Sequence, residues 1–117
     1  MRYYCHQLYE DDCGFASLKM LLAYTYHSKS YLNIPNPREK GRYSMFELQS
    51  YGRTYGILLK GYNISINGLK GEVNFPCIAL TSIDGIDHFV VILKANSKKV
   101  VILDPSKGCI KYDLNAF

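Results

Sequence analysis

The sequence lacks any hydrophobic run of the length that a membrane span requires. Among its 117 residues no apolar stretch approaches the roughly 18 to 20 residues that cross a bilayer. The first residues, MRYYCHQLYEDDCG, contain no continuous apolar segment and soon reach acidic residues, so they do not form a signal peptide. We therefore expect a soluble segment that does not insert into the membrane.

The sequence also lacks the common signatures of metal, nucleotide and nucleic-acid binding. No C-x-x-C pair occurs among its four cysteines, and no combination of histidine, cysteine and carboxylate has a metal-ligand spacing. No glycine-rich loop follows a predicted strand in a nucleotide-binding pattern. The net charge is +4, but the lysines and arginines are scattered and form no basic run. We expect no metal, no cofactor and no nucleic-acid partner.

The composition is that of one compact domain over residues 1–117. Hydrophobic residues make up 48% of the chain and charged residues 21%, which is enough apolar material for a core. An even number of cysteines permits two disulfides, but a domain of this size without a secretion signal favours free thiols. The four cysteines are Cys5, Cys13, Cys77 and Cys109.

The first half of the chain carries two helix signals. Helix formers dominate from Cys13 to Tyr26, and Asp12 is a good N-cap, which predicts a largely buried first helix. Residues 28–43 carry prolines, glycine and polar groups and are predicted to form a loop. Ser44 begins a capping-box pattern, so a second helix is expected from Met45 to Tyr55.

The second half consists of short β-branched runs separated by turn signals. The runs at 88–94 and 98–104 are joined by a short Asn/Ser/Lys turn and predict an antiparallel hairpin. Helices in the first half and strands in the second predict an α+β fold, with the helices packed on one face of an antiparallel sheet. The other predicted strands are 57–66, 76–83 and 108–113, and a last helix is expected to begin near Asp113.

Cys13 is the candidate nucleophile because it opens the first predicted helix. Unpaired N–H groups at a helix N-terminus favour a thiolate, so the position predicts a lowered pKa. The following Gly14 leaves space for a substrate backbone, whereas the acidic Asp11 and Asp12 oppose the thiolate. The alternative is that Cys13 is a small buried hydrophobic residue.

His88 and Asp104 are candidates for the base that activates the thiol and for its partner. His88 opens one strand of the predicted hairpin and Asp104 ends the other, so the hairpin brings both to the same end. Each has a structural alternative, since a histidine can cap a turn and Asp-Pro often terminates a strand. Gln7, in the extended lead-in before Cys13, has a side-chain amide that can donate to an oxyanion together with the Cys13 N–H.

Three segments of the chain resemble a known family. Residues 7–22, 87–92 and 100–108 (QLYEDDCGFASLKMLL, DHFVVI and VVILDPSKG) are similar to the blocks of the bacteriocin-processing cysteine peptidases. That family forms the N-terminal cytosolic domain of peptidase-containing ABC exporters and has a papain-like architecture. The loop from Ser28 to Arg42 departs from the family's pattern.

The resemblance implies a role for each candidate residue. Cys13 would be the nucleophile, His88 the general base and acid, Asp104 the residue that orients His88, and Gln7 an oxyanion donor. The family cleaves the leader from bacteriocin, lantibiotic or signalling precursors after a double-glycine motif, coupled to export. The implied partners are a precursor peptide with an amphipathic leader and the transmembrane and ATP-binding domains of an exporter, at the cytoplasmic face of a bacterial membrane.

Two further readings of the sequence stay open. Some exporters carry a related domain that has lost its cysteine and only docks the leader, although the presence of Cys13, His88 and Asp104 disfavours that reading. A purely structural domain would have neither a groove nor affinity for a leader.

Overall fold

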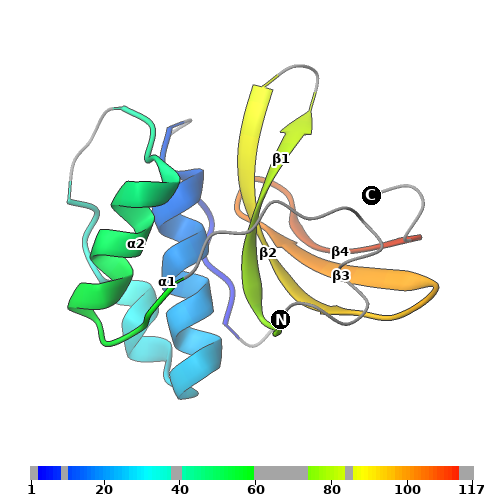
Figure 1. Ribbon diagram of the computed structural model, residues 1–117, viewed down its shortest axis with the longest axis horizontal. Helices are drawn as coiled ribbons and strands as arrows, with labels where there is room; N and C mark the ends of the chain where they lie inside the picture. The colour runs from blue at the N-terminus through cyan, green and yellow to red at the C-terminus, as the bar shows by residue number, and fades with distance from the viewer. Residues whose placement is uncertain (1–2, 9–10, 38–40, 60–73, 84–85, 114–117) are drawn as a thin grey trace.

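The fold is described by a computed structural model over residues 3–8, 11–37, 41–59, 74–83 and 86–113. Two helices lie side by side on one side of a strongly twisted sheet, and α1 lies between α2 and the sheet (Figure 1). The α+β fold predicted from the sequence is confirmed. The elements are α1 Cys13–Tyr26, a 3-10 helix η1 Lys29–Asn33, α2 Met45–Thr54, β1 Cys77–Ile83, β2 Ile86–Ala95, β3 Lys99–Asp104 and β4 Gly108–Asp113.

The sheet is an antiparallel meander with the strand order β1-β2-β3-β4. The predicted hairpin of β2 and β3 is confirmed, with Val91 opposite Leu103. Its turn is stabilised by Asn96, whose side-chain oxygen accepts hydrogen bonds from the backbone N–H groups of Lys98 and Lys99, both at 2.8 Å. This pairing brings the start of β2 and the end of β3 to the same end of the sheet.

The first helix has the predicted bounds and is buried along most of its length. It ends at His27, which adopts the left-handed conformation (φ 53°) and donates its backbone N–H to the carbonyl of Ala23. Even its charged residue Lys19 is buried, and the Lys19 ammonium donates to the Ile34 carbonyl and to the Asn36 side-chain oxygen, both at 3.3 Å. These bonds explain how a lysine is accommodated in this helix.

The predicted capping role of Asp12 is wrong, although Asp12 does occupy the N-cap position. Its side chain makes no capping hydrogen bond to α1. The Asp12 carboxylate instead accepts from the Leu8 backbone N–H at 3.0 Å and from the Asn36 amide at 2.6 Å. Asp12 therefore ties the N-terminal lead-in and the loop after η1 to the start of the helix.

Part of the segment between the helices, predicted as a loop, is helical. Residues 28–43 contain the 3-10 helix η1, whose first turn is capped by the Ser28 hydroxyl accepting from the Ser30 N–H. The capping box of α2 is confirmed, because the Ser44 hydroxyl and the Glu47 carboxylate each accept from the other's backbone N–H.

Each face of the sheet packs into its own buried cluster. Val91 of β2 and Leu103 of β3 pack with Met20 of α1, whereas Val90 and Ile92 pack together on the opposite face. Alternation along β2 therefore fixes which residues face the helices. Of the remaining predictions, residues 57–59 form no strand, and residues 60–66 and 114–117 lie outside the described part of the chain.

Candidate active site

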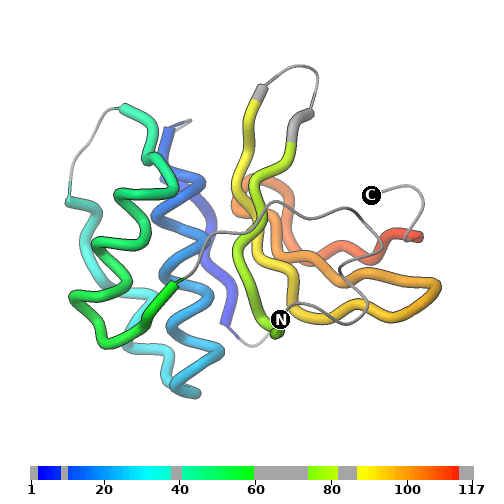
Figure 2. Tube along the Cα trace, in the orientation of Figure 1, coloured from blue at the N-terminus to red at the C-terminus, as the bar shows by residue number. Residues whose placement is uncertain are grey.

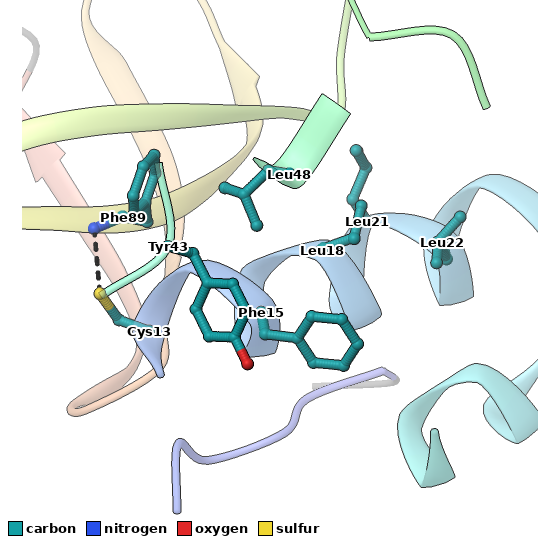
Figure 3. Packing of buried hydrophobic residues seen from close by; sticks show 8 residues of the cluster. All are labelled: Cys13, Phe15, Leu18, Leu21, Leu22, Tyr43, Leu48 and Phe89. Atoms are coloured by element: carbon teal, nitrogen blue, oxygen red, sulfur yellow. Dashed lines mark hydrogen bonds between the residues drawn. The ribbon is translucent and has the colours of Figure 1, made fainter. Parts of the chain in front are cut away.

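The candidate nucleophile lies where α1 meets the sheet. Cys13 is the first residue of α1, and it belongs to a buried cluster in which Phe89 and Tyr43 lie beside it (Figure 3). The backbone N–H of Phe89 donates to the Cys13 sulfur at 3.5 Å. Because Phe89 N is bonded to the His88 carbonyl carbon, the His88 Cα lies within about 6 Å of the sulfur.

The candidate base is bonded to a buried carboxylate. His88 Nε2 lies 2.8 Å from Asp104 Oδ1, and the side chains are 16% and 4% exposed. The same Asp104 oxygen accepts from the backbone N–H and the hydroxyl of Ser106, both at 2.8 Å. The Tyr4 hydroxyl donates to the Asp104 carbonyl at 2.6 Å. Asp104 is therefore fixed through both its side chain and its backbone.

These contacts favour the ionised form of the carboxylate. Burial alone raises the pKa of Asp104, but the hydrogen bonds from His88 and Ser106 outweigh burial and hold that pKa below its usual value. An ionised carboxylate can only accept, so His88 Nε2 carries the proton in its bond to Asp104. The second ring nitrogen, Nδ1, is then the acceptor of the neutral imidazole.

The predicted lowering of the Cys13 pKa is wrong. Burial raises the pKa of the Cys13 thiol above its usual value, and Asp12 adds to the rise. The N–H groups of Phe89 and Gly14 and the positive charge of Arg42 act in the opposite direction but do not outweigh burial. Burial therefore disfavours the thiolate form of Cys13.

Gly14 allows close packing at the first turn of α1. A Cβ atom at Gly14 would lie 3.1 Å from Phe89 Cδ2 and 3.2 Å from Tyr43 Cβ. The missing side chain lets β2 and the segment before α2 approach the first turn of α1 closely. Gly14 thereby allows Phe89 to come close enough to donate to the sulfur.

Gln7 belongs to the N-terminal lead-in, residues 3–8, and this segment runs between α1 and the sheet (Figure 2, dark blue). Its backbone N–H donates to the Pro105 carbonyl at 2.9 Å, directly after Asp104. The next residue, Leu8, donates to the carboxylate of Asp12. The lead-in is thus tied both to the end of β3 and to the start of α1, the two elements that carry Asp104 and Cys13.

A pocket of about 280 Å³ borders the thiol. Apolar side chains from α2 and β1 line one part of it, among them Met45 and Leu80, which are 44% and 43% exposed. Three charged residues, Asp11, Arg42 and Asp87, also line it. The lining residues are Asp11, Cys13, Arg42, Tyr43, Ser44, Met45, Leu80, Asp87 and Phe89. The pocket thus gives access to the region of Cys13, while the bonded His88–Asp104 pair lies at the start of β2 and the end of β3.

The profile of the Peptidase C39 family matches residues 1–117. The chain belongs to the Peptidase C39 family. A solved structure of a double glycine motif protease from an AMS/PCAT transporter, in complex with the leader peptide, superposes with a TM-score of 0.78 at 30% identity. That match covers 96% of this chain and 79% of the solved one. The fold is therefore the papain-like fold of C39 peptidases.

Two curated relatives are similar over most of the chain. The probable functional amyloid protease FapD of Pseudomonas aeruginosa is 29% identical over 91% of this chain, and the chain spans 51% of that protein. A putative ABC transporter ATP-binding MG390 homolog of Mycoplasma pneumoniae is 31% identical over 94% of this chain. The chain spans 16% of that protein, so it matches one region of a much longer polypeptide.

Sequence reasoning missed several groups of the site. The Ser106 N–H and hydroxyl on Asp104 were detectable, because Asp-Pro-Ser after a strand is typical of a turn closed by the Asp side chain. The Phe89 N–H and Arg42 carry no local signal, since their roles arise from tertiary contacts.

The part of the chain that the structure describes contains no group of three or more His, Cys, Asp or Glu able to hold a metal ion. No helix among the described residues is long and apolar enough to cross a membrane.

Proposed function

We propose that this chain is a cysteine endopeptidase domain that cleaves the leader of a precursor peptide after a Gly-Gly motif. The proposal rests on two hydrogen bonds. His88 is bonded to Asp104, and Phe89, the residue after His88, donates its backbone N–H to the Cys13 sulfur. Membership of the Peptidase C39 family supports the same reaction class.

The proposed reaction starts from a neutral thiol. His88 accepts the Cys13 proton, and the sulfur attacks the carbonyl carbon of the second glycine. The Cys13 backbone N–H and the Gln7 amide donate to the oxyanion. The imidazolium then protonates the leaving amine, and His88 activates the water that hydrolyses the thioester and restores the thiol. Asp104 keeps His88 in the required tautomer throughout.

The proposed substrate is a leader with an apolar helical face ahead of two glycines. Met45 and Leu80 line the pocket beside the thiol, and the neighbouring Phe46 is 74% exposed. Such a surface suits an amphipathic helix, which buries its apolar face in a groove. Glycines at the scissile bond, which carry no side chain, would suit the approach to a sulfur that is largely buried. The solved relative was itself determined with a leader peptide.

We place the domain within a peptide exporter, at the cytoplasmic face of a bacterial membrane. The support is the transporter relative, which continues far beyond the region matched by this chain, and the transporter origin of the solved protease. The matured peptide would be a bacteriocin, a lantibiotic or a signalling peptide.

A direct test is cleavage of a synthetic double-glycine leader peptide, followed by mass spectrometry. The wild-type protein should cut after the second glycine, whereas Cys13→Ala and His88→Ala should not. Cys109→Ala and His6→Ala change exposed residues of the same types and serve as matched controls that should cleave normally. A peptide with Ala-Ala at the cleavage site should resist. Equal cleavage by the wild type and both active-site variants would refute the proposal.

The second candidate is a domain that docks the leader without cleaving it. The burial of Cys13, only 6% exposed, is the observation that favours it. Calorimetric titration with the leader peptide would then detect binding, while the wild-type protein would leave the peptide intact over prolonged incubation.

A further inference from the structure

The segment Gly41–Ser44 contacts both halves of the candidate site. At one end, the Gly41 N–H donates to the Asp11 carboxylate at 3.3 Å, two residues before Cys13. Next to it, Arg42 Nη1 donates to the Asp87 carbonyl at 2.6 Å, one residue before His88. This short segment therefore links the stretch that precedes the thiol to the stretch that precedes the imidazole.

The segment is also held against α1 by packing. Tyr43 is 3% exposed, and its Cβ would lie 3.2 Å from a Cβ placed on Gly14. Ser44, the residue after it, caps α2. Arg42 is thus held at its backbone and at its side chain. Its neighbour Tyr43 is buried, and its guanidinium donates to the Asp87 carbonyl at the start of β2.

Arg42 brings a positive charge to the pocket that borders the thiol. It lines that pocket together with Cys13, Asp11 and Asp87. Its charge lowers the pKa of the thiol, whereas the negative charge of Asp12 raises it. Tyr43 also lines the pocket, and His88 is the residue before Phe89, whose N–H donates to the sulfur.

We propose that Arg42 is a positioning residue of the peptidase site, which holds the start of β2 against α1 and stabilises the Cys13 thiolate as it forms. The inference rests on the proposed function. By holding the Asp87 carbonyl, the guanidinium fixes the backbone that carries His88 and the Phe89 N–H. Its charge favours the sulfur anion left when the proton moves to His88.

Two substitutions separate these contributions. Arg42→Gln retains a hydrogen-bond donor but removes the charge, and Arg42→Lys retains the charge without the planar guanidinium fork. Arg53→Gln is the matched control, because Arg53 is an exposed arginine in the last turn of α2. Thermal unfolding of each variant verifies that it folds.

The first readout is the rate at which iodoacetamide alkylates Cys13, measured between pH 6 and 10 by mass spectrometry of the Cys13 peptide. Arg42→Gln should shift the pH profile upwards and slow alkylation at pH 8 roughly threefold to tenfold. Arg42→Lys should remain close to the wild type, and Arg53→Gln should match it. A purely structural role for Arg42 would not shift this profile.

The second readout is cleavage of the leader peptide. Arg42→Gln should lower kcat by about tenfold with KM within about twofold, because the interaction develops in the transition state. An unchanged alkylation profile in Arg42→Gln overturns the inference even if the wild type cleaves the leader. Arg42-dependent alkylation in a wild type that cleaves nothing would support the inference at the thiol and refute the proposed function.

Discussion

His88 and Asp104 are held by hydrogen bonds, whereas Cys13 is held by close packing among apolar side chains. Three donors converge on one oxygen of Asp104, and each lies at 2.8 Å. The Cys13 sulfur accepts a long bond of 3.5 Å from the Phe89 N–H, and Cys13 belongs to a buried hydrophobic cluster. The polar half of the candidate site (His88 and Asp104) thus has its orientation fixed by hydrogen bonds, while burial of the apolar half (Cys13) disfavours a charge on the sulfur.

Removing the carboxylate should have the largest effect on the polar half. Asp104→Ala takes away the acceptor that orients His88, and we expect kcat for leader cleavage to fall by about 10²- to 10³-fold. Asp104→Asn keeps an oxygen acceptor, as in Cys-His-Asn proteases, and should stay within about tenfold of the wild type. Steady-state cleavage assays measure both. Wild-type activity in Asp104→Ala would show that His88 needs no orienting partner.

The apolar half should respond to added volume. In Gly14→Ala, the new methyl group would crowd Phe89 and Tyr43, and we expect a loss of about 1–3 kcal/mol in the free energy of unfolding. Urea denaturation followed by circular dichroism measures it. Ser50→Ala, at an exposed position of α2, is the control and should change stability by less than about 0.5 kcal/mol. A fully stable Gly14→Ala would argue against tight packing at the thiol.

Acid should remove the stabilising contribution of the Asp104 carboxylate to the fold. Since the pKa of Asp104 is lower in the folded chain than its usual 3.8, the carboxylate stabilises the fold above that pH, and this contribution is lost as the pH falls through the folded value. Between about pH 4 and 2, the free energy of unfolding should therefore fall more steeply in the wild type than in Asp104→Asn. Urea titrations at several pH values compare the slopes. Identical slopes would mean that the carboxylate has no favourable contacts.

Ser106→Ala should give the smallest effect. It removes one of the three donors to Asp104 while the Ser106 N–H remains, so we expect a loss of about 0.5–1.5 kcal/mol in stability. A rise in the Asp104 pKa, followed by NMR titration of the carboxyl carbon, should accompany it. The exposed neighbour Lys107→Ala is the control and should leave that pKa unchanged.

Much of the fold could be predicted because its signals are local. The apolar run that opens at Cys13 and the capping box at Ser44 marked both helices, and the Asn96 turn marked the hairpin. The 3-10 helix η1 was missed because its cap is a single serine in a polar, proline-containing stretch. Short turns of this kind carry little periodicity for a sequence to reveal.

The site was less predictable, because its electrostatics depend on packing. The position of Cys13 at a helix N-terminus is a local feature and indicated a lowered pKa. Burial beneath Phe89 and Tyr43 is a tertiary feature, and it reverses the direction. For the same reason nothing in the sequence indicated Arg42, whose bond to Asp87 joins positions far apart in the chain.

The contact between Cys13 and Phe89 joins residues 76 positions apart, whereas every strand of the sheet pairs with its neighbour along the chain. During folding, the hairpins can close early because their loops are short. The Cys13 sulfur can contact β2, which carries His88 and Phe89, only after the long loop between these positions has closed. A newly synthesised chain would then contain all of its reactive groups without being a protease. Under the proposed function, proteolytic capacity would emerge only with this last long-range step.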